Sequence, residues 1–80
     1  LVYDTQISVV RLPASGLEGQ TVVEADVRAA TGCTVVAIVR DGETVTDFDP
    51  EQATIAADDD VVIVGTDESI TAFERRFSAD

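Results

Sequence analysis

The chain has 80 residues, 45% of them hydrophobic, and its sixteen acidic and five basic residues give a formal net charge of −11. A chain of this length makes one small domain (1–80, with a core at about 7–77). No apolar run reaches the ~18 residues of a membrane span, so we expect no direct membrane insertion. So high a negative charge repels the phosphates of nucleic acids, so we also expect no nucleic-acid partner.

The first expected element is a strand over residues 7–12, in which Ile7 and Val9 share one face. Pro13 ends this strand, because proline has no N–H to donate to a sheet. The serine and glycines that follow, as far as Gly19, predict a loop.

A helix is expected to begin after Thr21, because Thr21 and Glu24 have the spacing of a capping box. Gly32 is placed to end the helix. Three apolar residues of this segment predict one buried stripe: Val23, Val27 and Ala30. Asp26 could cap a second short helix, and the sequence leaves one helix or two open.

The next elements are two strands joined by a tight turn. Residues 35–39 form an almost continuous run of β-branched residues, which is typical of a strand covered on both sides. Asp41-Gly42 favours a type I′ hairpin turn. The returning strand is expected over residues 43–48, with Val45 inward, until Asp49-Pro50 ends it.

A fourth strand is expected over residues 61–64, after a polar stretch in which Ile55 is the core residue. A final helix follows, capped by Thr66 or Asp67. Its apolar residues recur at helical spacing and predict an amphipathic helix: Ile70, Phe73 and Phe77.

This order predicts an α+β domain with a four-stranded β-sheet and two helices, in β-α-β-β-β-α order. Because the chain begins with Leu1 rather than Met, we expect a domain excised from a longer protein. No signal peptide is expected, since the first apolar run is broken at Asp4.

The chemistry of the chain argues against an enzyme. It has no histidine and no lysine, so only carboxylates could serve as a base beside a nucleophile. The single Cys33 is expected to be a small buried hydrophobe, with a reactive thiol as the alternative. Asp58-Asp59-Asp60 is interpreted as a solvated acidic turn, with a hard-cation site as the alternative. We expect no metal site and no cofactor.

Three segments carry a family resemblance. They are Ser15-Gly16-Leu17-Glu18-Gly19-Gln20-Thr21, the long segment Thr31-Gly32-Cys33-Thr34-Val35-Val36-Ala37-Ile38-Val39-Arg40-Asp41-Gly42, and Asp60-Val61-Val62-Ile63-Val64-Gly65. In this order and spacing, the sequence resembles the TrkA C-terminal (RCK C-terminal) domain family.

The resemblance implies a regulatory domain of a potassium or other ion transport system, cytoplasmic and associated with a membrane transporter or channel subunit. Members of the family form homodimers, and some bind cyclic di-AMP between the two copies. The resemblance therefore implies a ligand-sensing domain with a cyclic dinucleotide as its ligand. A dimerisation and coupling module that binds no small molecule is the alternative.

Arg40 is the leading candidate for a ligand contact, because it ends an apolar strand in a chain with few cations. Its guanidinium could bind a phosphate through two parallel hydrogen bonds, or it could pair with Asp41, Glu43 or Asp47. Strict alternation along the strand predicts a single ligand-binding face: Thr34, Val36, Ile38 and Arg40. That face would offer apolar contact to adenine.

The acidic surface is interpreted as an adaptation to high salt, as in a halophilic archaeon, with a surface for one specific partner as the alternative. In molar salt the Debye length is ~3 Å, which screens carboxylates from one another.

We predict that folding depends on salt. Dilution from molar to millimolar KCl should lower the melting temperature, because the repulsion between sixteen carboxylates is then less screened. Thermal unfolding followed by circular dichroism measures this. An unchanged melting temperature would contradict the high-salt interpretation.

Overall fold

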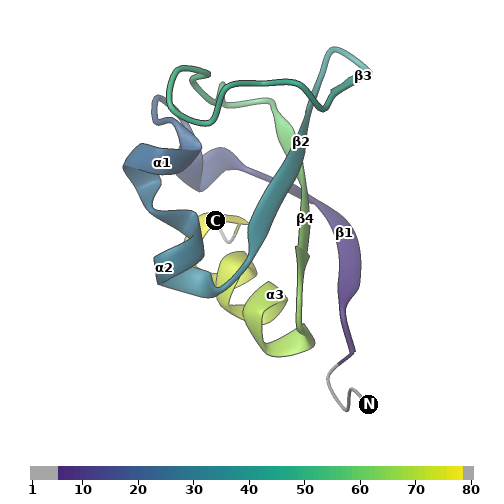
Figure 1. The fold of residues 1–80 in the computed structure, drawn as a ribbon. Helices are drawn as coiled ribbons and strands as arrows, with labels where there is room; N and C mark the ends of the chain where they lie inside the picture. Colours follow the sequence, from purple (N-terminus) through teal and green to yellow (C-terminus); the bar gives the residue numbers. More distant parts are fainter. Residues whose placement is uncertain (1–5, 79–80) are drawn as a thin grey trace.

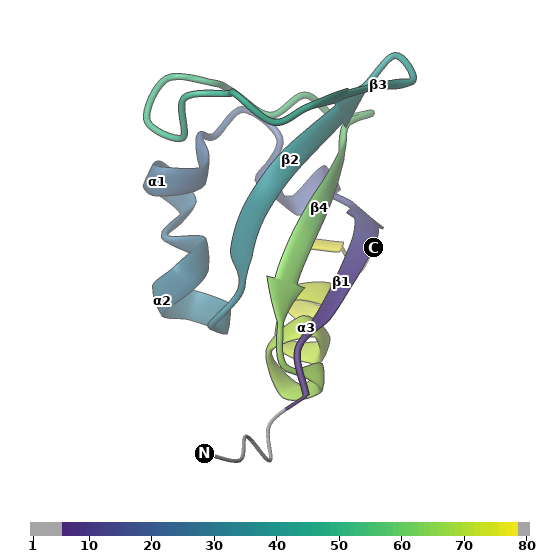
Figure 2. The ribbon, with the colours of Figure 1, turned by 45° about the vertical axis from the view of Figure 1, so that its right-hand side comes forward.

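A computed structural model describes residues 6–78. Four antiparallel strands form one sheet in the order β1-β4-β2-β3, and the helices lie on one face of it (Figures 1 and 2). The strands are β1 (Ser8–Pro13), β2 (Thr34–Arg40), β3 (Glu43–Val45) and β4 (Asp60–Gly65). The helices are α1 (Val22–Ala25), α2 (Val27–Thr31) and α3 (Asp67–Phe73), with a 3-10 turn η1 (Ser15–Leu17) and a π-helical turn η2 (Glu74–Ser78). The predicted α+β class and element order are confirmed.

The first helical segment is two short helices rather than one. The capping box is present, since Thr21 Oγ1 accepts from the Glu24 N–H at 3.0 Å and Glu24 Oε1 accepts from the Thr21 N–H at 2.9 Å. Asp26 then adopts a left-handed conformation, with φ at 53°, and separates α1 from α2.

The break at Asp26 changes which side chains reach the core. Val27 is buried, whereas Val23 is 53% exposed and Ala30 is also exposed, so the predicted stripe is wrong. The left-handed residue turns α2 relative to α1, so one helical period does not run through both. Val22 and Ala25 pack against the core in place of Val23 and Ala30.

The predicted hairpin turn is confirmed, because Asp41 and Gly42 have φ values of 53° and 80°. The returning strand is shorter than predicted and ends at Val45 instead of Phe48. Phe48 turns back to pack against the core, which takes the chain out of the sheet. The connection that follows is bonded to the region before α1, where the Ile55 N–H donates to the Gln20 carbonyl.

A bulge in β2 divides the residues of that strand between the two faces of the sheet. Val35 lies opposite Ile63, but Ala37 lies opposite Val62, so Val36 is the extra residue. Core residues on the helix-covered face include Val35, Ile38, Val61 and Ile63.

The other face of the sheet carries no helix in the described part of the chain (Figure 2). Ala37 and Val39 lie on this face, yet they are only 2% and 4% exposed. The predicted burial of this strand on both sides is therefore present within a single chain.

The C-terminal helix packs under the sheet as its periodicity predicted. Ile70, Phe73 and Phe77 are all buried, and the rings of Phe73 and Phe77 have centroids 5.2 Å apart. Thr66 caps α3, since its Oγ1 accepts from the Ser69 N–H at 3.1 Å.

Gly16 makes the closest backbone approach in this packing. A Cβ added at Gly16 would lie 2.6 Å from the carbonyl oxygen of Phe77, and the obstacle is main chain rather than a movable side chain. The contact between η1 and η2 therefore depends on glycine at this position.

We predict that Gly16→Ala lowers the free energy of unfolding by about 1–3 kcal/mol, because the added methyl group forces the two turns apart. Urea denaturation measures this change. Ser15→Ala, at an exposed position of the same turn, is the control and should unfold like the wild type. Equal stability of wild type and Gly16→Ala would show that η2 can move without loss.

Candidate functional site

The four residues predicted to share one face of β2 do not share it. Thr34 lies opposite Val64 on the uncovered face, and Val36 is the bulge residue. Ile38 lies on the helix-covered face, and Arg40 points to the same side, two residues further along. The bulge at Val36 shifts the alternation by one residue, so the four-residue ligand face is wrong as a geometric unit.

Ile38 and Arg40 instead line a pocket at the hairpin end of the sheet. The pocket has a volume of about 150 Å³, and its lining is largely apolar. The remaining walls come from β3 and from the connection after it: Val45, Phe48 and Ala53.

The guanidinium of Arg40 is held by Asp59. Arg40 Nε donates to Asp59 Oδ1 at 2.9 Å, and Arg40 Nη2 donates to Asp59 Oδ2. Nη2 also donates to the Thr54 carbonyl at 3.0 Å. Of the two alternatives for Arg40, the ion pair is present in this structure. Its partner is none of the three neighbouring acids considered from the sequence.

Asp59 is a buried residue rather than part of a solvated turn. Its side chain is 2% exposed, against 48% for the side chain of Arg40, and its Oδ2 accepts a further hydrogen bond from the Ala56 N–H at 2.8 Å. A buried carboxylate needs such partners, because an unpaired charge in the interior is strongly destabilising.

The pair shifts the titration of both residues. The hydrogen bonds from Arg40 hold the pKa of Asp59 below its ordinary value, although burial acts in the opposite direction. The same hydrogen bonds raise the pKa of Arg40 further. Both groups are therefore ionised at neutral pH.

The pairing also decides which donors of Arg40 remain for a ligand. An arginine has five N–H groups, and Nε and Nη2 together supply three. All three are used on Asp59 and the Thr54 carbonyl, so Nη1 keeps its two N–H groups for other acceptors. A phosphate can bind at Nη1 alone, whereas a fork across two nitrogens would have to displace either Asp59 or the Thr54 carbonyl.

Sequence reasoning found Ile38 and Arg40 but missed Val45, Phe48 and Ala53 as walls of a pocket. Val45 was predicted to point inward, which is a partial indication that it lines the pocket. The connection after β3 was interpreted as polar and irregular, so its return over the end of β2 was not predicted.

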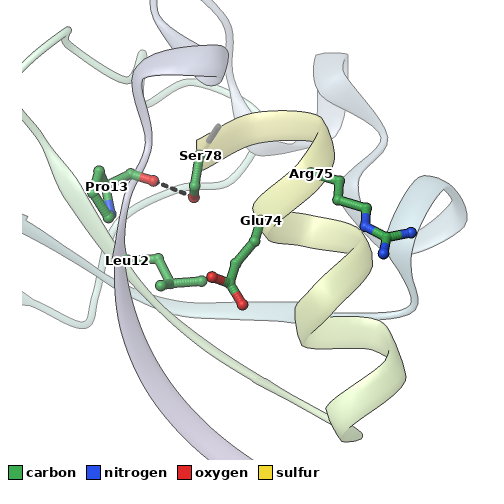
Figure 3. A pocket seen from close by; sticks show the side chains of 5 residues that line it. All are labelled: Leu12, Pro13, Glu74, Arg75 and Ser78. Atoms are coloured by element: carbon green, nitrogen blue, oxygen red, sulfur yellow. Dashed lines mark hydrogen bonds between the residues drawn. The ribbon is translucent and has the colours of Figure 1, made fainter. Parts of the chain in front are cut away.

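A second hollow lies between the end of β1 and the C-terminal turn (Figure 3). It has a volume of about 270 Å³ and is lined by Leu12, Pro13, Glu74, Arg75 and Ser78. Figure 3 shows the Glu74 carboxylate directed toward Leu12 and the Arg75 guanidinium directed away. Because its polar groups do not converge, this hollow is a weaker candidate for a ligand site than the Arg40 pocket.

Other chemistry considered from the sequence has no counterpart in residues 6–78. No group of three or more metal-ligating side chains lies close enough to hold an ion. Cys33 is buried, as expected of a small hydrophobe, and burial raises the pKa of its thiol. Within the same residues, no helix is long and apolar enough to cross a bilayer.

The described features define a class: a small α+β domain with helices on one face of an antiparallel sheet and a pocket at the hairpin end. The chain belongs to the TrkA-C domain family, whose family model matches residues 7–78. The resemblance seen in the sequence is thereby confirmed. Among curated proteins, none matches this chain.

Similar solved structures agree with this family assignment. The RCK C domain of the potassium transport protein KtrA, in complex with cyclic di-AMP, is 28% identical, with a TM-score of 0.79, and the match covers 88% of this chain and 82% of that one. The GsuK RCK domain is 29% identical with a TM-score of 0.73, and the match covers 88% of this chain but 16% of that one. The RCK_C domain dimer of S. agalactiae BusR in complex with cyclic di-AMP has a TM-score of 0.72 at 23% identity, covering 91% and 90% of the two chains, and it supports the fold alone.

We predict that the Arg40–Asp59 pair makes the free energy of unfolding depend on pH in the acidic range. Folding lowers the pKa of Asp59, so the ionised carboxylate stabilises the folded state fully at neutral pH. This stabilisation is lost as the pH falls from about 4 toward the folded-state pKa. Asp59→Asn should lower the free energy of unfolding by about 2–3 kcal/mol at pH 7, and this difference should shrink at pH 3.

Urea denaturation at pH 7, 5 and 3 measures both effects. Asp58→Asn is the matched control, because Asp58 is an exposed neighbour, and it should keep the wild-type pH dependence. A constant difference between wild type and Asp59→Asn at all three pH values would contradict the assignment.

Proposed function

We propose that this chain is a ligand-sensing regulatory domain of a potassium transport system and that it binds cyclic di-AMP at the Arg40 pocket. The observation that carries the proposal is the pocket itself, in which an apolar cavity is bordered by a guanidinium at the end of β2. The likeness to the KtrA RCK C domain supports it, because that structure is a complex with this ligand.

The pocket residues have the chemistry that such a ligand requires. Ile38, Val45 and Phe48 offer an apolar surface to an adenine ring. Arg40 offers an N–H group of Nη1 to a phosphate oxygen, in a charge-assisted hydrogen bond. Asp59 keeps the guanidinium in place, and it also offsets the charge of Arg40. The affinity for phosphate is therefore modest.

We further propose that the domain acts as a homodimer attached to a transporter or channel subunit on the cytoplasmic side of the membrane. A two-fold dimer presents two copies of Arg40 to a ligand that has two phosphates. The family and its relatives support a regulatory role without catalysis.

One observation favours a second candidate, a coupling module that binds no small molecule. The charge of Arg40 is already balanced by Asp59, so the guanidinium has a structural role even without a ligand. The two candidates differ in whether the pocket is occupied by a ligand.

The absence of a nucleic-acid partner stays a prediction that rests on the net charge of −11. BusR has been solved in complex with promoter DNA, but this chain covers 37% of that longer BusR chain. At 24% identity this likeness shows the fold alone, so DNA binding by BusR does not bear on this domain.

We predict that calorimetric titration with cyclic di-AMP in molar KCl gives a saturable heat, and that Ala53→Leu weakens binding at least about tenfold by filling the pocket. Ala29→Leu, the same change at an exposed position of α2, should bind as the wild type does. Ala53 suits this test better than Arg40, because removing Arg40 would leave Asp59 buried without its partner.

Two outcomes would decide against the proposal. No heat from the wild type with cyclic di-AMP would favour the coupling module. Equal affinities for wild type and Ala53→Leu would move the ligand away from this pocket.

A further inference from the structure

Three carboxylates surround the guanidinium of Arg40, although a phosphate site needs positive charge. Asp59 holds the guanidinium directly, through Nε at 2.9 Å and through Nη2. Glu43 lies directly opposite Arg40 in the pairing of β2 with β3, and directly opposed residues project from the same face. Asp41 is the next residue in the chain, and its charge is close enough to raise the pKa of Arg40.

These carboxylates differ in how strongly salt screens them from a bound anion. Asp41 and Glu43 are exposed, so in molar KCl, where the Debye length is ~3 Å, their charges are largely screened. The side chain of Asp59 is only 2% exposed, and buried charges are screened much less. The negative charge that a phosphate meets beside Arg40 is therefore set by Asp59.

Asp59 also limits the hydrogen bonds that Arg40 can make to a phosphate. Nε and Nη2 donate to Asp59 and to the Thr54 carbonyl, so a phosphate binds at Nη1 alone. It receives fewer hydrogen bonds there than a fork across two nitrogens would give. The protein therefore compensates a bound phosphate only partly for the water that it loses.

The charge of the ligand decides how much this shortfall matters. The attraction between an anion and the Arg40–Asp59 pair grows in proportion to the charge of the anion, whereas the cost of removing the anion from water grows with the square of that charge. The attraction per unit charge is small, because Asp59 cancels much of the field of Arg40. The balance is therefore less favourable for a doubly charged phosphate than for a singly charged one.

We infer that Asp59 is a specificity-determining residue, which makes the Arg40 pocket select phosphodiesters over phosphomonoesters. Each phosphate of a diester carries one negative charge, whereas a monoester carries up to two at pH 7, since its second pKa is about 6. A nucleotide that ends in a free phosphate, such as ATP, is thereby rejected by its charge as well as by its shape. The inference rests on the proposed function and deepens it, because it names the class of phosphate that the site accepts.

Calorimetric titrations with two ligands that carry the same bases test this inference. Cyclic di-AMP has two diesters, whereas the linear dinucleotide pApA, in which one ring bond is opened, has one diester and one terminal monoester. In molar KCl at pH 7.5, the wild type should bind cyclic di-AMP at least about tenfold more tightly than pApA. Asp59→Asn removes the charge and nearly keeps the shape, so it should reduce this ratio at least about fivefold. Glu43→Gln, the same change of charge at an exposed residue opposite Arg40, should keep the wild-type ratio.

A pH series separates the charge of Asp59 from a merely structural role. Lowering the pH from 7.5 to 5.5 protonates the monoester of pApA and leaves the diesters unchanged. The affinity of the wild type for pApA should therefore rise at least about threefold, while the affinity for cyclic di-AMP stays constant. The chain has no histidine, and Arg40 keeps the pKa of Asp59 below its ordinary value, so the change of charge occurs on the ligand. In Asp59→Asn, the rise for pApA should be smaller.

Equal ratios for wild type and Asp59→Asn would overturn the inference, and so would a wild-type affinity for pApA that does not change with pH. Either result, together with wild-type binding of cyclic di-AMP, would leave the proposed function standing. No heat with cyclic di-AMP would overturn both. Thermal unfolding by circular dichroism shows whether each variant is folded. If Asp59→Asn is not, the pH series on the wild type and on Glu43→Gln decides alone.

Discussion

The ion pair between Arg40 and Asp59 connects three parts of the chain that are remote in sequence. Arg40 ends β2, Asp59 directly precedes β4, and Thr54, whose carbonyl accepts from the same guanidinium, lies in the connection between β3 and β4. That connection has no helix or strand of its own, so its position depends on such contacts. Because it supplies Phe48 and Ala53, the shape of the pocket follows from the same interaction.

The pair also has opposite effects on folding stability and on the binding of an anionic ligand at this site. A buried carboxylate needs its partner, which keeps most donors of Arg40 occupied. A ligand therefore meets a guanidinium that Asp59 and the Thr54 carbonyl already hold in place and whose charge Asp59 balances. Rigid placement reduces the entropy lost on binding, whereas the neighbouring carboxylate weakens the attraction for an anion. The apolar walls then provide much of the affinity.

Local features of the fold could be predicted from the sequence because neighbouring residues determine them. The turn at Asp41-Gly42 and the cap at Thr21 depend on a few adjacent side chains, and both were predicted. The break at Asp26 remained open, because an aspartate inside a helical pattern can cap a helix or simply face solvent. The bulge at Val36 could not be predicted, since a run of β-branched residues looks the same with or without an extra residue.

The candidate site was predicted in part for the same reason. Arg40 and Ile38 follow from their place near the end of a strand, but the bulge takes Thr34 and Val36 out of the site. Asp59, the partner of Arg40, is the buried residue in a run of three aspartates. Only the tertiary arrangement distinguishes it from its neighbours.

The strand order has a consequence for how the domain forms during synthesis. β4 is the last strand in the sequence, yet it lies inside the sheet and pairs with both β1 and β2. Until it leaves the ribosome, β1 has no neighbour and the β2–β3 hairpin lacks most of its core. Pairing between strands so distant in sequence is slow compared with local helix formation. β1 and β2 therefore cannot become parts of one sheet until Asp60–Gly65 has been translated.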